Sequence, residues 1–149
     1  MSDALLRFVP QDPAYVPSSD AAQKAKALLA SFLPDAEAIE NEVHPTIVFV
    51  DPGENWSGVS CPACSADAEP WWSDAMSSAH ESGFTSLVID APCCGSSVSL
   101  NNLNYVWPVA FGRFVIQALN PNSVGLTSEQ LAQLGAVVGC PLREVPAHV

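Results

Sequence analysis

The alternation of apolar and polar residues predicts three helices in this chain. Apolar residues recur at helical spacing over 20–33, 70–82 and 127–139, so each segment has one apolar face. Thr127-Ser-Glu-Gln130 matches a capping box, and Asp20-Ala-Ala-Gln23 resembles one with Asp at the first position. Pro70 suits the first position of the second helix.

Shorter apolar runs between these helices predict strands. They cover 5–9, 46–50, 84–91, 111–119 and 142–145. The four consecutive apolar residues at 47–50 indicate a strand that is buried on both faces. Two further runs flank Asn101-Asn102, a pair that tolerates the positive φ of a tight turn, so 98–105 is predicted to be a hairpin.

Four of the five cysteines lie in two short groups. Cys61-Pro62-Ala63-Cys64 follows one apolar run, and Cys93-Cys94-Gly95 follows another after twenty-eight intervening residues. A tight turn can direct two thiols two residues apart at one point, and two such turns can meet at one tetrahedral metal ion. Gly95 supplies a residue that readily adopts positive φ.

Cys61-Pro-Ala-Cys64 resembles the first knuckle of zinc-ribbon proteins. Pro92-Cys93-Cys94-Gly95 stands where such proteins carry a second Cys-x-x-Cys pair. The resemblance implies a structural Zn²⁺ held by Cys61, Cys64, Cys93 and Cys94. Adjacent cysteines point in different directions unless the backbone folds sharply, so His80 on the second predicted helix is the alternative fourth ligand. The resemblance covers 61–95 and does not extend to the remainder of the chain.

The same cysteines have three other interpretations. Cys61 and Cys64 could form a redox dithiol, the thiols could form disulfides, or they could be buried free cysteines. The acidic run after Cys64 argues against a redox dithiol, because nearby carboxylates raise a thiol pKa. No charged and then apolar signal segment opens the chain, which argues against disulfides. Cys140 is expected to fill core.

The order of elements predicts an α+β fold with a mixed or antiparallel sheet and about three helices on it. Residues 5–40 and 111–146 each read as strand, helix, strand, with a zinc-knuckle segment at 46–107 inserted between these two βαβ-like halves of a single domain, 1–149. When the chain is slid by 106 positions, Arg7-Phe8-Val9 falls on Arg113-Phe114-Val115 and Ile39 falls on Val145. This similarity predicts an internal duplication.

Composition limits the classes of partner. The 149 residues are 48% hydrophobic and 14% charged, which suits one domain with a buried core. Sixteen acidic residues against five basic ones give a formal charge of -11, and such a surface repels the phosphates of nucleic acids. No apolar run approaches the length of a membrane span, so a soluble, cytoplasmic protein without a membrane partner is expected.

No nucleophile elbow, phosphate-binding loop, dinucleotide fingerprint or His-Glu-x-x-His helix occurs in the sequence. We therefore expect a small acidic, zinc-stabilised module that is not an enzyme. Its partner would be another protein with a basic face, in the manner of small inhibitor or immunity proteins. The alternative is an enzyme that uses Cys61 and Cys64 as a redox dithiol or holds an open zinc site.

Overall fold

The computed structural model describes residues 3–149, which form three helices, one four-stranded sheet and two short two-stranded ribbons. None of these helices has the length and apolar character needed to cross a bilayer. The elements, in chain order, are β1 (Ala4–Pro10), α1 (Ser19–Phe32), β2 (Ala38–Val50), β3 (Val59–Ser60), α2 (Glu69–Glu81), β4 (Val88–Asp90), β5 (Ser97–Ser99), the 3₁₀ turn η1 (Leu100–Asn102), β6 (Asn104–Tyr105), β7 (Ala110–Leu119), α3 (Ser128–Val138) and β8 (Leu142–His148).

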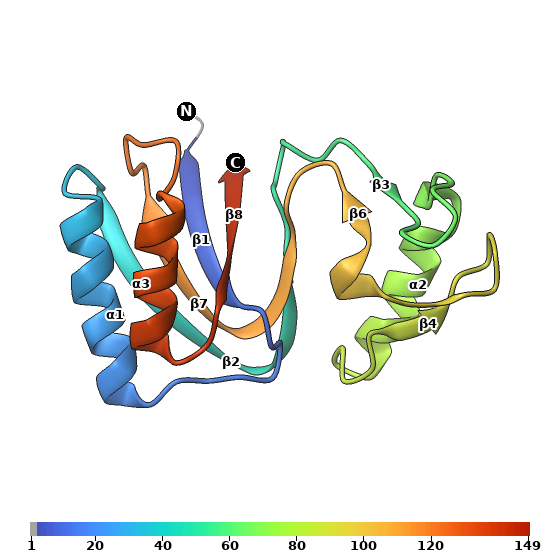
Figure 1. The fold of residues 1–149 in the computed structure, drawn as a ribbon, viewed down its shortest axis with the longest axis horizontal. Helices are drawn as coiled ribbons and strands as arrows, with labels where there is room; N and C mark the ends of the chain where they lie inside the picture. Colours follow the sequence, from blue (N-terminus) through green and yellow to red (C-terminus); the bar gives the residue numbers. More distant parts are fainter. Residues whose placement is uncertain (1–2) are drawn as a thin grey trace.

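The four-stranded sheet has the order β2-β7-β1-β8, and all three neighbouring pairs are antiparallel. One half of the chain runs β1-α1-β2 and the other runs β7-α3-β8. Figure 1 shows α1 and α3 side by side on the same face of the sheet. This is the connectivity of the split βαβ, or ferredoxin-like, arrangement. The expected α+β fold with two strand-helix-strand halves is confirmed.

The main core lies between this sheet and its two helices. Alternate residues of β1 and β7 face the helices, whereas Val9 and Val115 between them pack in a separate cluster. The helix-facing positions are fully or almost fully buried, and they comprise Leu6, Phe8, Phe114, Ile116 and Ala118 from the strands with Ala25, Leu29, Leu134 and Val138 from the helices. Leu33 and Leu142 belong to the same contiguous apolar cluster.

Helix boundaries follow local capping chemistry. The predicted capping box of Thr127 and Gln130 is present at α3, and Gly139 ends that helix with φ 98°. At α1 the predicted cap was wrong. Ser18 caps this helix, because its Oγ accepts a hydrogen bond of 3.2 Å from the Ala21 N–H, and Asp20 lies inside the first turn.

Residues 51–109 replace a simple turn between β2 and β7, and we call them the inserted segment. Figure 1 shows it on the side of the sheet opposite α1 and α3. It has its own apolar core, which includes Phe111 and the partly buried Phe49 of the two flanking strands. Arg143 of β8 also holds it, donating hydrogen bonds to both oxygens of Asn101, at 2.7 and 2.9 Å, and to the Val109 carbonyl at 3.2 Å.

Strand pairing in the inserted segment differs from the expectation. The predicted hairpin around Asn101-Asn102 is wrong, since residues 100–102 form η1, β5 pairs with β4, and β6 pairs with β3. The predicted strand at 84–91 shortens to β4, because Phe84 has φ 57° and cannot continue a strand. In contrast, β2 is longer than the strand predicted at 46–50. It begins at Ala38 and has a register shift between Val43 and Val48.

The strand registers bear on the predicted duplication. In a duplicated structure Arg113 corresponds to Arg7 and Ile39 to Val145. If Arg7 pairs with Val145 across the sheet, Arg113 should therefore pair with Ile39. Val145 pairs with Arg7, whereas Ile39 pairs with Ala118, five residues beyond Arg113. The registers of β2 and β8 therefore do not correspond when the sequences are aligned with an offset of 106 positions. The internal duplication of residues 5–40 and 111–146 stays a prediction.

Candidate metal centre

Four thiols converge at the end of the inserted segment. The sulfur atoms of Cys61, Cys64, Cys93 and Cys94 all lie within 4.8 Å of one another. Cys61 Sγ is 3.9 Å from Cys94 Sγ, and Cys64 Sγ is 3.4 Å from Cys93 Sγ. Sulfurs bound to one tetrahedral Zn²⁺ at about 2.3 Å lie about 3.8 Å apart. The cluster therefore has the size of a four-thiolate site, as the spacing predicted.

The first pair of thiols comes from a turn at residues 61–66, the first turn. The Cys61 N–H donates to the Ala66 carbonyl at 2.8 Å, and the Ser65 N–H donates to the Cys61 carbonyl at 2.8 Å. Ser65 has φ 65°, a left-handed conformation that reverses the chain. Ser60 and Asp67 form a β-bridge at the base of the turn.

The second pair comes from residues 91–96, the second turn, which has the same construction. The Ala91 N–H donates to the Ser96 carbonyl at 2.8 Å, and the Gly95 N–H donates to the Ala91 carbonyl at 2.7 Å. Gly95 has φ 75°, and Asp90 pairs with Ser97 at the base. The backbones of the two turns therefore correspond position by position, thirty residues apart.

This correspondence shows that the two turns carry their thiols differently. Cys64 and Cys94 both occupy the fourth position of their turn. The first position holds Cys61 in one turn and Ala91 in the other, and both residues are fully buried. Cys93 instead occupies the third position, where the first turn has Ala63. Matching Cys61-Pro62 with Ala91-Pro92 in the sequence is the signal that reveals this arrangement.

Burial and charge also differ among the four thiols. Cys61 is buried, whereas Cys64, Cys93 and Cys94 are exposed. Hydrogen bonds from the hydroxyl and the backbone amide of Ser96 lower the pKa of Cys94 to about 7. Desolvation, together with hydrogen bonding to the other three cysteines that favours the protonated thiol, raises the pKa of Cys93 to about 12. A bound divalent cation would favour the thiolate form at every ligand.

His80 lies outside this cluster. It stands at the last turn of α2, where its ring packs edge-on against Phe84 with 5.5 Å between the centroids. It lines a separate groove with Thr46 and Met76. The four cysteines, without His80, are thus the group that could hold a metal ion. Cys140 lies between α3 and β8 and is partly buried.

Aromatic rings support the inserted segment beside the metal centre. Trp71 and Trp72 are both partly buried and pack against the core that contains Cys61. Trp72 lies 4.7 Å from the Trp56 ring and donates to the Tyr105 hydroxyl at 3.2 Å. Burial raises the pKa of Tyr105 to about 12. Sequence reasoning missed the contacts of Trp56 and Tyr105 with Trp72, because the three rings come from separate parts of the chain and meet only in the folded segment.

The chain matches no protein-family model, no curated protein and no solved structure. Its function is therefore inferred from the thiol cluster and the surfaces around it.

Proposed function

We propose that this chain is a zinc-stabilised protein-interaction module whose acidic inserted segment binds a partner with a basic face. The observation that carries the proposal is the convergence of four thiols from two turns of the same construction. Zn²⁺ is the metal that four thiolates in a tetrahedral arrangement most often hold in a structural site.

The small core of the inserted segment favours such a cross-link. A unit of about 60 residues is only marginally stable on its apolar core, and metals commonly add stability to small units. One ion would tie β3 and the first turn to β4 and the second turn. Four protein thiolates also complete the coordination shell, so a structural role fits this ligand set better than a catalytic zinc with an open position.

The distribution of charge supports a basic partner. The inserted segment contains seven acidic residues and no lysine or arginine. The three arginines of the chain make internal contacts: Arg7 with the Asp51 carbonyl, Arg113 with the His44 carbonyl, and Arg143 with Asn101. A surface of one sign attracts an oppositely charged protein and speeds its association.

Metal analysis of the full chain purified without added zinc tests the first part of the proposal. One zinc per chain, with slow thiol labelling that becomes fast after chelation, is the expected result. The absence of metal, with four thiols that label rapidly from the start, would refute a structural zinc site.

The second part is tested by a pull-down from extract of the source cells with the zinc-loaded chain. Retained proteins should be basic and should elute as salt rises, because screening weakens contacts between exposed charges. Recovery of the same proteins on a matched column of chelated protein would show that the metal-ordered surface is not what they bind.

A further inference from the structure

A groove with a cavity volume of about 480 Å³ lies between α2 and β4, beside the second turn. Its walls include Trp71, Val88, Ile89 and Pro92, and two carboxylates, Asp74 and Asp90, also line it. Val88 is 63% exposed although it belongs to a strand. The groove therefore combines apolar walls with negative charge.

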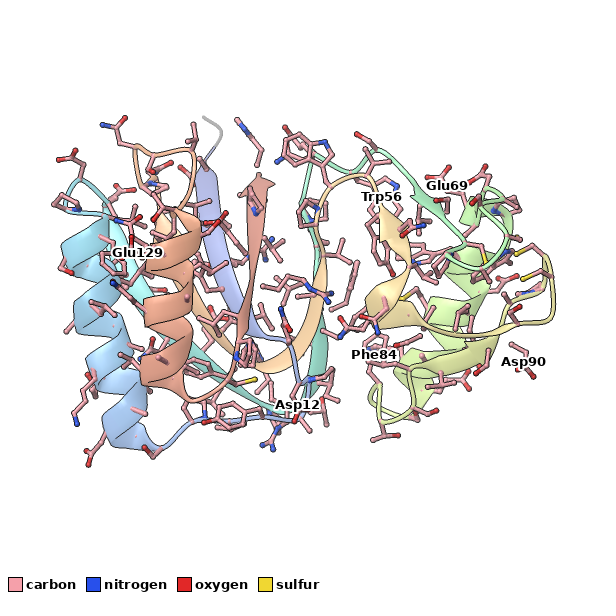
Figure 2. The ribbon with its side chains drawn as sticks, in the orientation of Figure 1. Asp12, Trp56, Glu69, Phe84, Asp90 and Glu129 are labelled. Atoms are coloured by element: carbon pink, nitrogen blue, oxygen red, sulfur yellow. The ribbon has the colours of Figure 1, made fainter. Side chains whose placement is uncertain are left out.

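Trp71 has an indole N–H without a hydrogen-bond partner. Its Nε1 atom is covered, yet it meets no acceptor among residues 3–149. The neighbouring Trp56 and Trp72 donate to Glu69 and to the Tyr105 hydroxyl, each at 3.2 Å. Figure 2 shows Trp56 and Glu69 close together on the inserted segment. Buried indole groups are usually paired, so the Trp71 N–H is an exception among these rings, and it is the ring of Trp71 that lines the groove.

The carboxylates at this groove have no cation of their own. Among the described residues, neither Asp74 nor Asp90 has a basic side chain within ion-pair distance, and both are exposed. In Figure 2, Asp90 lies at the end of the inserted segment that is remote from the sheet. An approaching chain can therefore reach it without meeting α1 or α3.

Resting on the proposed function, we infer that this groove docks an extended segment of the partner protein that bears lysine or arginine. The apolar stem of such a side chain packs on Val88 and Ile89 while its charged head meets Asp74 or Asp90. The Trp71 ring adds a favourable surface for a cation.

Other occupants and another groove fit less well. A second copy of this chain would bring the same formal charge of -11 to the surface, and a nucleic acid would bring phosphates. The groove lined by Thr46, Met76 and His80 on the other side of α2 has no carboxylate in its wall. It therefore lacks the charge that selects a cationic segment.

The test is an NMR titration of the zinc-loaded, nitrogen-15-labelled full chain with a capped peptide, Gly-Ser-Leu-Arg-Leu-Lys-Ser-Gly. The indole N–H signal of Trp71 and the amides of α2 and β4 should shift most. A peptide with Glu in place of Arg and Lys should not bind. An unshifted Trp71 indole, or equal binding of the acidic peptide, would overturn the inference.

Variants separate the groove from overall charge. Asp74→Asn with Asp90→Asn should weaken peptide binding at least tenfold, and Trp71→Phe, which replaces the indole with a ring that attracts a cation less strongly, should weaken it severalfold. The control, Asp35→Asn with Glu40→Gln, removes two exposed charges outside the inserted segment and should change the affinity less than twofold. Equal losses in both double variants would overturn the inference.

The zinc content of each variant is measured in parallel. Peptide binding that maps elsewhere on a zinc-loaded chain would defeat the groove but leave the proposed function intact. A chain without zinc would instead defeat the proposed function.

Discussion

Moving the fourth thiol from position 93 to position 91 tests whether the two turns are equivalent. In the first turn the buried Cys61 provides a thiol 3.9 Å from Cys94. Ala91 occupies the same backbone position in the second turn, with the same hydrogen bond of 2.8 Å from its N–H. The double variant Ala91→Cys with Cys93→Ser should therefore rebuild a four-thiolate site from two identical turns.

The expected magnitudes follow from ligand count. Cys93→Ser alone removes one thiolate, and its zinc affinity should fall by at least about 100-fold, beyond the 10–100-fold that the loss of an outer-shell partner costs. Adding Ala91→Cys should restore the affinity to within about tenfold of the parent, or about 1.4 kcal/mol.

Zinc competition against a chelator measures the affinities, and the absorption of bound Co²⁺ distinguishes four-thiolate from three-thiolate coordination. Cys140→Ser, which removes a thiol outside the cluster, is the control and should bind zinc like the parent. A double variant that binds no better than Cys93→Ser would refute the equivalence of the turns.

Three other predictions concern parts of the fold that hold the site. Arg143→Met removes the hydrogen bonds to Asn101 and leaves buried carbonyl groups unpaired. Thermal unfolding should therefore show that the free energy of unfolding falls by about 2–4 kcal/mol. A fall below about 0.5 kcal/mol would contradict this role of Arg143. Ser65→Gly should stabilise the zinc-loaded chain by about 1 kcal/mol in denaturant unfolding, because glycine adopts the left-handed φ of 65° without strain. Gly95→Ser should destabilise the chain by a similar amount. Effects of the same sign in both variants would argue that the two turns do not match. The raised pKa of Tyr105 means that the fold favours the neutral phenol, so this contribution to stability is complete below pH 10 and is lost as pH rises towards about 12. Ultraviolet titration should find one tyrosine that ionises near pH 12. That transition should be absent in the Tyr105→Phe variant.

The sequence predicted best where the deciding interactions are local. The capping box joins Thr127 to Gln130, three residues apart, and the apolar run that predicted the strand at 111–119 involves only residues of β7 itself. The hairpin at Asn101-Asn102 failed because its supposed strands pair with β3 and β4, and because Arg143, forty-two residues away, binds the Asn101 side chain. Strand choice of this kind depends on contacts that no local pattern contains.

The candidate site shows the same difference between what local sequence predicts and what distant contacts decide. The spacing of the cysteines was sufficient to predict four thiols at one point, because short turns restrict where their side chains can lie. The spacing alone did not show that Cys93 takes a position different from that of Cys61, because that comparison needs the match of Cys61-Pro62 with Ala91-Pro92, which the hydrogen bonds of the second turn made visible. It also did not show that α2 and β4 border a groove, because the two elements come together only in the folded segment.

Loss of the metal should loosen the inserted segment while the sheet and its helices stay folded. The core between the sheet and helices α1 and α3 contains no residue from 51–109, so removing the ion takes no contact from it. All four tryptophans lie in the inserted segment, which makes their fluorescence a selective probe of that part. With a chelator, tryptophan emission should shift to longer wavelength, while slow hydrogen exchange persists at Phe8 and Phe114. Simultaneous loss of both signals would mean that the two cores unfold as one unit, and the ion would then stabilise the whole chain rather than only the segment that carries its ligands.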